Sequence, residues 1–412
     1  MADQTSIRLI IFSHFFAPGI GGVEKQVMSL ASGLTQKNAP SDQPKFEVTV
    51  VTNTAAPPEQ DAVHAFQVIR RPNFFRLCRL IQRAHVVHIA GPSLLPLAIS
   101  YFLRKPTVIE HHGYQSICPN GILIYEPDRS VCPGHFQARR YAKCLKCLAA
   151  ESSLASSFKR LLLMFPRYLL SKSVTANIAI TKHVLERHGL PHAQVIYYGI
   201  ENVADLGISA RPPRRDGDKF RFAFVGRFVP EKGIEVLLLA AQMLKSLRLD
   251  FEVRLIGDGP LRAELEESIK RFDLVDHVYI TGFVDPGLPM KNALSDVDVV
   301  VVPSVWEEAA GFSAIEQMID GRLVIASDVG GLAEIVADGG LLFPMRDAAA
   351  LASLMKRVLL DRSLVESIGA TSRKRALALF DRDRMIRDHV RLYLKVARLP
   401  TVVSDRNTMH AA

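Results

Sequence analysis

Short apolar runs alternate with helical stretches along the chain, and this alternation limits the fold more than any other feature. A first series of predicted strands comprises Ile7–Phe12, Glu47–Val51, Val86–Ala90, Thr107–Glu110, Ile178–Ile180 and Val195–Tyr198. A second series comprises Phe220–Val225, Phe251–Ile256, Val278–Thr281, Val297–Val302, Leu323–Ala326 and Gly340–Phe343. Such runs with helical spacers are typical of parallel sheets covered by helices. We therefore predict an α/β fold with two tandem, doubly wound (Rossmann-like) domains.

The length of 412 residues also favours two domains. Residues 210–218 are polar and contain proline and glycine, which is typical of a linker. We predict a first domain at 1–205 and a second at 206–381. We predict a terminal helix at 382–399 and a loose tail at 400–412. In one predicted arrangement, the terminal helix packs on the first domain and completes it.

The net charge of +9 is uneven, because residues 1–200 carry 22 − 11 = +11 and the remainder carries 29 − 31 = −2. A basic half suits nucleic acid, an anionic membrane or phosphorylated substrates. No metal-finger spacing or aromatic RNA-stacking pair is present, so nucleic acid is not expected. Without a leader pattern or an apolar run of about 18 residues, we expect a cytoplasmic protein, with attachment to the inner face of the membrane left open.

The segment 303–316 contains two acids, Glu308 and Glu316, on either side of a glycine turn at Gly311. It follows the predicted strand at 297–302, and a helix is predicted to begin near Phe312. A helix N-terminus after a strand can hold a phosphate or sugar oxygen, and Glu316, about one turn later, can face a ribose diol. Taken alone, however, two solvated acids beside an ordinary loop remain an alternative.

Two basic residues, Arg227 and Lys232, follow the first strand of the second series. Lys232 is predicted at a helix start, so both can converge on a diphosphate, arginine through its fork and lysine as a point charge.

These segments together resemble the donor-binding half of retaining glycosyltransferases of the GT-B fold, family 4. The resemblance rests on Gly226–Gly233, Gly257–Pro260, Gly282–Val284, Glu308–Glu316 and Gly330–Gly331, in this order and spacing. It implies that Arg227 and Lys232 grip the diphosphate of a UDP- or GDP-sugar, and that Glu316 bonds the ribose.

The same resemblance places the backbone of Gly311, Phe312 and Ser313 against sugar and phosphate, and Glu308 beside the transferred sugar. Glu307 lacks the eight-residue separation from Glu316 and is treated as a neighbour. The chain departs from the family pattern at Ala310, Gln317 and Leu323, which leaves the donor sugar undetermined.

In the first domain, Gly19, Gly21 and Gly22 resemble the family's glycine loop, which borders the diphosphate and the acceptor. The family's cleft histidine comes six residues before a cysteine, which selects His112 over His111. Its expected task is to hold a sugar hydroxyl or the acceptor, or to carry a proton. His88 is a second cleft candidate.

Four cysteines, Cys118, Cys132, Cys144 and Cys147, fall within thirty residues, and the last two have the two-residue spacing of a zinc site. A cysteine-containing subset of family 4 is similar. We favour structural zinc, with an iron–sulfur cluster or unliganded thiols as alternatives, over disulfides.

The basic, apolar stretch 158–172 fits either an anionic bilayer surface or an ordinary core-facing helix. The resemblance implies a retaining sugar transfer without a catalytic metal, to a saccharide or lipid-linked acceptor in bacterial surface polysaccharide assembly. A nucleotide-sugar epimerase on the same fold and a non-catalytic scaffold remain alternatives.

Overall fold

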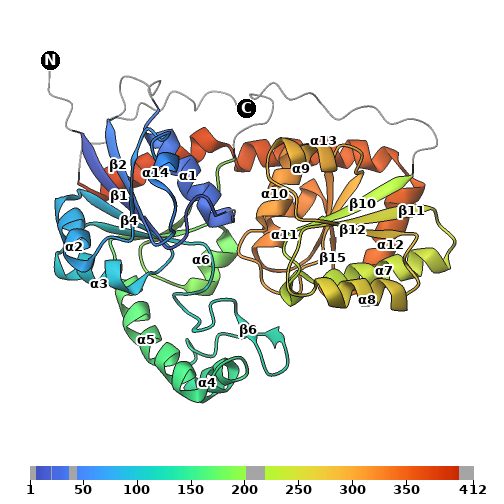
Figure 1. Cartoon of the computed structure of the whole chain (residues 1–412), viewed down its shortest axis with the longest axis horizontal. Coiled ribbons are helices and arrows are strands. Elements are labelled where there is room, and N and C mark those ends of the chain that lie inside the picture. The colour runs from blue at the N-terminus through green and yellow to red at the C-terminus, as the bar shows by residue number, and fades with distance from the viewer. Residues whose placement is uncertain (1–5, 20, 37–43, 201–218, 399–412) are drawn as a thin grey trace, which may run out of the picture. The chain divides into compact units, whose positions relative to one another are not determined.

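The computed structural model describes residues 6–19, 21–36, 44–200 and 219–398. The chain divides into two compact units, of which unit 1 contains residues 1–200 and 382–412 and unit 2 contains residues 201–381. Each unit is built around its own parallel sheet (Figure 1). The predicted linker and tail lie outside the described residues.

Unit 1 has a seven-stranded sheet in the order β3-β2-β1-β4-β5-β8-β9, with every neighbouring pair parallel. Its strands are β1 (Ile7–Ser13), β2 (Phe46–Thr52), β3 (Gln67–Arg70), β4 (Val86–Ala90), β5 (Thr107–His111), β8 (Ala176–Ala179) and β9 (Ala193–Val195). Its helices are α1 (Gly22–Leu34), α2 (Phe74–Arg83), α3 (Leu94–Phe102), α4 (Tyr141–Ala149), α5 (Leu154–Ser173), α6 (Lys182–His188) and α14 (Arg382–Val396), with a 3₁₀ turn η1 (Pro58–Gln60).

The prediction of six strands for this part of the chain was incomplete, because β3 was missed. Its four residues include only two apolar side chains, too few for a periodicity to be recognised. The last predicted strand, at 195–198, was wrong in position, since β9 ends where that prediction begins.

The C-terminal helix α14 belongs to the core of unit 1. Its residues Met385, Ile386, Val390 and Tyr393 are buried in one apolar cluster with side chains of β1, β2 and α1, and Figure 1 shows α14 beside these elements. The helix ends three residues before the predicted end at 399.

Unit 2 has a six-stranded parallel sheet in the order β12-β11-β10-β13-β14-β15. Its strands are β10 (Phe220–Val225), β11 (Phe251–Ile256), β12 (Val278–Gly282), β13 (Val299–Val302), β14 (Leu323–Ser327) and β15 (Leu341–Phe343). Its helices are α7 (Ile234–Ser246), α8 (Arg262–Arg271), α9 (Leu288–Ala293), α10 (Phe312–Ile319), α11 (Gly330–Val336), α12 (Ala348–Leu360) and α13 (Ser363–Leu379), with 3₁₀ turns η3 (Pro230–Lys232) and η4 (Ala337–Gly339).

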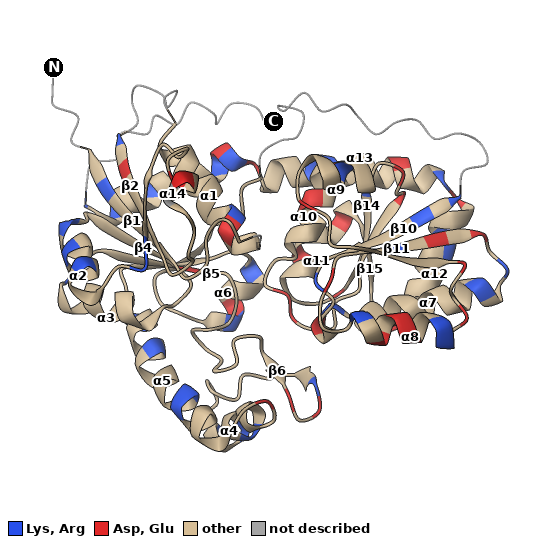
Figure 2. Ribbon diagram, in the orientation of Figure 1, with Lys and Arg blue, Asp and Glu red and all other residues tan. Residues whose placement is uncertain are grey.

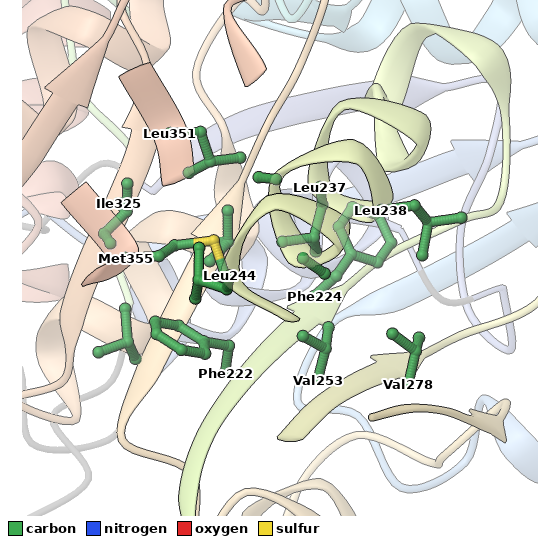
Figure 3. Packing of buried hydrophobic residues seen from close by; sticks show 14 of the residues in the cluster. Phe222, Phe224, Leu237, Leu238, Leu244, Val253, Val278, Ile325, Leu351 and Met355 are labelled. Atoms are coloured by element: carbon green, nitrogen blue, oxygen red, sulfur yellow. The ribbon is translucent and has the colours of Figure 1, made fainter. Parts of the chain in front are cut away.

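The strand order reverses between β10 and β13, as in doubly wound nucleotide-binding domains. The core on this sheet is apolar: Leu237 and Leu244 of α7 belong to the same buried cluster as Phe222 and Val253 of the sheet (Figure 3). Burying one such side chain stabilises the fold by about 1.5–3 kcal/mol, so this packing gives the strand ends a rigid support.

The segment with α4, α5 and a small antiparallel pair, β6 (Ile124–Tyr125) and β7 (Ser130–Val131), extends from the sheet of unit 1 (Figure 1). Among the described residues, no helix combines the length and the apolarity needed to cross a bilayer.

Candidate functional site

In unit 2 the predicted donor residues follow β10 and β13, the two strands at which the strand order reverses. Ligands of open parallel sheets bind at the carboxyl ends of such strands. The backbone N–H of Val305, in the loop after β13, donates to the carbonyl of Glu231, in the loop after β10, at 2.9 Å. This bond holds the two loops together.

An ion pair joins Lys232 of the first loop to Glu308 of the second. Lys232 Nζ lies 2.5 Å from Glu308 Oε1, and the Ser304 hydroxyl donates to the same oxygen. Burial raises the pKa of Glu308, but the charge of Lys232 and the hydrogen bonds outweigh it and hold this pKa below its usual value. Glu308 is therefore a carboxylate at neutral pH, and it is almost fully buried.

Gly233 lets these loops approach. Its φ of +66° lies in the left-handed region, and a Cβ there would overlap the carbonyl oxygen of Pro303. Lys232 is the last residue of the 3₁₀ turn η3. It was predicted at a helix start, and α7 begins two residues after it.

Arg227 differs from Lys232, because its side chain is exposed and forms no hydrogen bond or ion pair with the described part of the chain. The structure thus brings Lys232 to Glu308 but leaves Arg227 in solvent.

The remaining donor residues lie on α10. Gly311 is its N-cap in the left-handed conformation, and a Cβ there would lie 3.2 Å from Glu308 Oε2. Phe312 and Ser313 form the first turn, and Glu316 follows in the next turn, partly buried.

In unit 1, Gly19, Gly21 and Gly22 lie at the start of α1, with Gly21 as the N-cap. The carboxylate of Glu24, in the first helical turn, is folded against Gly21. A carboxylate is favourable at this positive end of the helix dipole, so an incoming phosphate would have to displace or share that position.

His112 lies just after β5 with its ring nitrogens directed into the protein. Nδ1 is 2.9 Å from the Tyr198 hydroxyl, and Nε2 is 3.7 Å from Glu110 Oε2. Burial lowers the pKa of His112, which favours the neutral ring at pH 7. His111 is instead bonded to Asn177 and Ser116.

His88, the second cleft candidate, is fully buried at β4. Its Nδ1 is bonded to Tyr393 of α14 at 2.8 Å, and its Nε2 lies 3.1 Å from Glu110 Oε2. Burial raises the pKa of Glu110, but the nearby histidines, His112 first, outweigh it and lower this pKa to about 2.

Sequence reasoning missed Glu110, His389 and Tyr393 as functional candidates. A usable signal was the spacing of Met385, His389 and Tyr393, which places a histidine on the apolar face of the last helix. Three side chains in the described part of the chain place their possible metal-ligand atoms close together. They are His88, Glu110 and His389.

The four clustered cysteines, Cys118, Cys132, Cys144 and Cys147, are free buried thiols that line one cavity of about 10 Å³. This is room for about one water-sized sphere. The backbone N–H of Glu126 donates to Cys147 Sγ at 3.4 Å. Burial raises the pKa of Cys144 to about 12, so Cys144 is a neutral thiol unless a cation stabilises its thiolate.

Comparison with solved structures fixes the fold. Anabaena HepE in complex with UDP matches with a TM-score of 0.67 over 95% of this chain and 100% of that one, at 18% identity. Sucrose-phosphate synthase from Thermosynechococcus elongatus matches with the same TM-score over 95% and 99%, at 22% identity. The chain has the GT-B fold. The fold class predicted from the alternation of strands and helices is confirmed.

Sequence comparisons concern a smaller part of this GT-B chain. Residues 208–375 match the family model "Glycosyl transferases group 1". A 2-deoxystreptamine glucosyltransferase of Streptomyces kanamyceticus is 39% identical over 34% of this chain, and a phosphatidyl-myo-inositol mannosyltransferase of Mycolicibacterium smegmatis is 33% identical over 40%. These matches span only 36% and 43% of the two relatives' own length.

Proposed function

We propose that this chain is a retaining glycosyltransferase of family 4 that moves a sugar from a UDP- or GDP-sugar to an acceptor. The observation that carries the proposal is the Lys232–Glu308 pair at the point where the strand order of unit 2 reverses. The family match of residues 208–375 to group 1 glycosyl transferases supports it, and the solved complex of HepE with UDP supports a uridine donor.

The donor binds to unit 2 in this proposal. Exposed Arg227 closes on the diphosphate, and Lys232 shares its three donors between Glu308 and a phosphate oxygen. The first turn of α10, from Gly311 through Phe312 and Ser313, receives the sugar and phosphate oxygens, and Glu316 bonds the ribose hydroxyls.

Glu308 acts on the transferred sugar. As a buried carboxylate it holds sugar hydroxyls or stabilises the cationic ring of the transition state. The leaving diphosphate, stabilised by Arg227 and Lys232, helps to deprotonate the acceptor on the same face of the sugar, so the configuration is retained. These two cations supply the charge that a catalytic metal would otherwise provide.

The acceptor belongs to unit 1 in this proposal, beside the glycine loop and His112, and it is a saccharide or lipid-linked glycan of bacterial surface polysaccharide assembly. The names of two relatives support such an acceptor, the phosphatidyl-myo-inositol mannosyltransferase and the amylovoran biosynthesis glycosyltransferase of Erwinia amylovora.

A surface formed by α2, α3 and α5 suits an anionic bilayer, where a cytoplasmic enzyme would meet such an acceptor. The three helices contain 3 + 0 + 4 = 7 Lys and Arg residues and no Asp or Glu, and Figure 2 shows the basic positions on α2 and α5. Neighbouring helices of this group are in contact. Large apolar side chains are exposed on it, among them Phe75, Phe102, Phe158 and Leu162.

Vesicle binding tests the membrane part. The double variant Phe75→Ser, Phe102→Ser should bind vesicles with anionic phospholipid several-fold more weakly than wild type, with an unchanged melting temperature. Val63→Ser, at another exposed apolar position, is the control. Equal binding by all three proteins would remove the bilayer from the proposal.

Donor binding tests the transferase itself. Titration calorimetry and a donor-hydrolysis assay should show binding and turnover of at least one UDP- or GDP-sugar, with losses of tenfold or more in Arg227→Ala and Glu316→Ala. An acceptor-independent change of the sugar would favour the epimerase, and binding without turnover would favour the scaffold. The proposal fails if wild type binds no donor.

The proposal also places structural zinc at the four cysteines. The common cavity and the N–H donors to Cys147 Sγ support it. The four sulfur atoms do not meet the 4.8 Å limit that the His88, Glu110 and His389 group meets, so they draw closer together when an ion binds. Metal content below about 0.2 zinc or iron per chain, with folding unchanged by a chelator, would contradict it. Iron in place of zinc would indicate a cluster.

A further inference from the structure

A further group of buried polar side chains lies on β4, β5 and α14 of unit 1. It consists of His88 on β4, Glu110 on β5 and His389 on α14, and all three side chains have zero exposed fraction. One ligand atom from each lies within 4.8 Å of the other two. Such burial of a carboxylate between two imidazoles is costly unless a cation or proton joins them.

Among the residues that the structure describes, Glu110 has no lysine or arginine as an ion-pair partner. Within the described ranges, the ion-pair partners of Glu110 are the histidines alone, with His88 Nε2 at 3.1 Å, His112 Nε2 at 3.7 Å and His389 Nε2 at 3.9 Å from Oε2. Neither Oε2 nor any of these three nitrogens forms a hydrogen bond of acceptable geometry in the described part of the chain. Four buried polar atoms of the described chain therefore converge without a well-formed hydrogen bond between them.

The outer ring nitrogens are already fixed. His389 Nδ1 is 2.8 Å from the carbonyl oxygen of Met385, which can only accept, so the neutral ring carries its proton on Nδ1 and a lone pair on Nε2. Tyr393 bonds the Nδ1 of His88, and Gln26 bonds the other oxygen of Glu110. Partners of this kind orient histidine and carboxylate ligands around metal ions.

We infer that His88, Glu110 and His389 bind a divalent transition metal, with zinc the best fit. Nitrogen and oxygen ligands at about 2.0–2.2 Å from tetrahedral zinc stand about 3.3–3.6 Å apart, a separation that the distances of 3.1 and 3.9 Å bracket. A water takes the remaining position of the ion. The ion fastens the C-terminal helix to β4 and β5 and thereby stabilises unit 1.

The test uses the whole chain without a polyhistidine tag. Purified protein is incubated with zinc, dialysed and measured for bound metal and for melting temperature. His389→Asn keeps a hydrogen-bonding group near the position of Nδ1 but lacks Nε2, and it should lose one equivalent of zinc per chain. When zinc is added, its melting temperature should rise by several degrees less than that of wild type, because only the cysteine cluster is left to bind the metal.

His188→Asn is the matched control. His188 is also buried and bonds a helical carbonyl four residues earlier through Nδ1, but no carboxylate is paired with it among the described residues. It should keep the full metal content. Cobalt distinguishes the cysteine cluster, because thiolate ligands give sulfur-to-metal charge-transfer bands, and a Cys144→Ser, Cys147→Ser variant should lose only that signal.

The inference is overturned if His389→Asn and Glu110→Gln bind as much zinc as wild type, or if wild type binds none outside the cysteine cluster. In the latter case a proton shared among the histidines holds Glu110. If His389→Asn does not fold, Glu110→Gln provides the same test. Zinc binding is also tested without any variant, by removing the metal from wild type with a chelator and adding it back. Donor binding by unit 2 is measured separately, so its loss or retention does not affect this result.

Discussion

The two units each bury a glutamate, and the contrast between these carboxylates is informative. Glu308 in unit 2 has a lysine at 2.5 Å and a serine hydroxyl on the same oxygen, so its charge is balanced by the protein itself. Glu110 in unit 1 has histidines as its only ion-pair partners within the described ranges. A lysine is charged at any physiological pH, whereas a histidine supplies a charge only when it is protonated or holds a metal.

The contrast also separates two roles. The Lys232–Glu308 pair is at the carboxyl ends of two strands, where a phosphate can compete for the lysine. The Glu110 group is buried between the sheet and α14, so we expect it to affect the stability of unit 1. The first substitution to test is the one that leaves the buried charge of Glu308 without its lysine.

The largest effect is expected from Lys232→Met. It leaves Glu308 buried without its cation, and breaking a buried pair in this way costs about 3–5 kcal/mol of unfolding free energy. Urea unfolding at pH 7 measures it. The double variant Lys232→Met, Glu308→Gln should recover most of the loss, because no buried charge remains. Arg227→Met, an exposed control, should change the unfolding free energy by less than about 0.5 kcal/mol. Equal losses in the single and double variants would contradict the role given to the pair.

A smaller and conditional effect is expected from Glu110→Gln. With zinc at about 100 times its dissociation constant, wild type should gain about 2.7 kcal/mol that the variant does not gain. In a chelating buffer the variant should be as stable as wild type or more stable, since an uncompensated buried charge has been removed. Chemical unfolding in the two buffers measures both values. A Glu110→Gln loss that is equal in both buffers would make Glu110 comparable to Glu308 and abolish the contrast.

The sequence predicted the second domain better than the first. Strands β10 and β11 match their predicted bounds because mainly apolar residues form them and a glycine follows each strand directly, Gly226 and Gly257. The Lys232–Glu308 contact was not predicted, since 76 residues separate the partners and only the strand order brings their loops together. The resemblance assigned both residues to a donor but not to each other.

The Glu110 group shows a stronger limit. Glu110 and His88 lie on neighbouring parallel strands, so their closeness follows from the sheet. His389 comes from the far end of the chain, and although one predicted arrangement packs the terminal helix on the first domain, no local pattern places this histidine beside Glu110. The missed edge strand β3 has the same cause, because pairing with β2 compensates for its weak apolar pattern.

The smallest effect concerns acid. Because the pKa of Glu308 is held below its usual value of 4.5, its pairing stabilises the folded chain above about pH 4.5. That contribution is lost as the pH falls further, through the lower pKa of the folded state, because protonation removes the charge that Lys232 compensates. The difference in unfolding free energy between wild type and Glu308→Gln should therefore be constant from pH 7 to about 5 and shrink towards pH 3. Chemical unfolding of both proteins across this range measures it, and the subtraction cancels all other carboxylates. A difference that stays constant down to pH 3 would mean that Lys232 does not hold Glu308 ionised, and the distinction between the two buried glutamates would then rest on geometry alone.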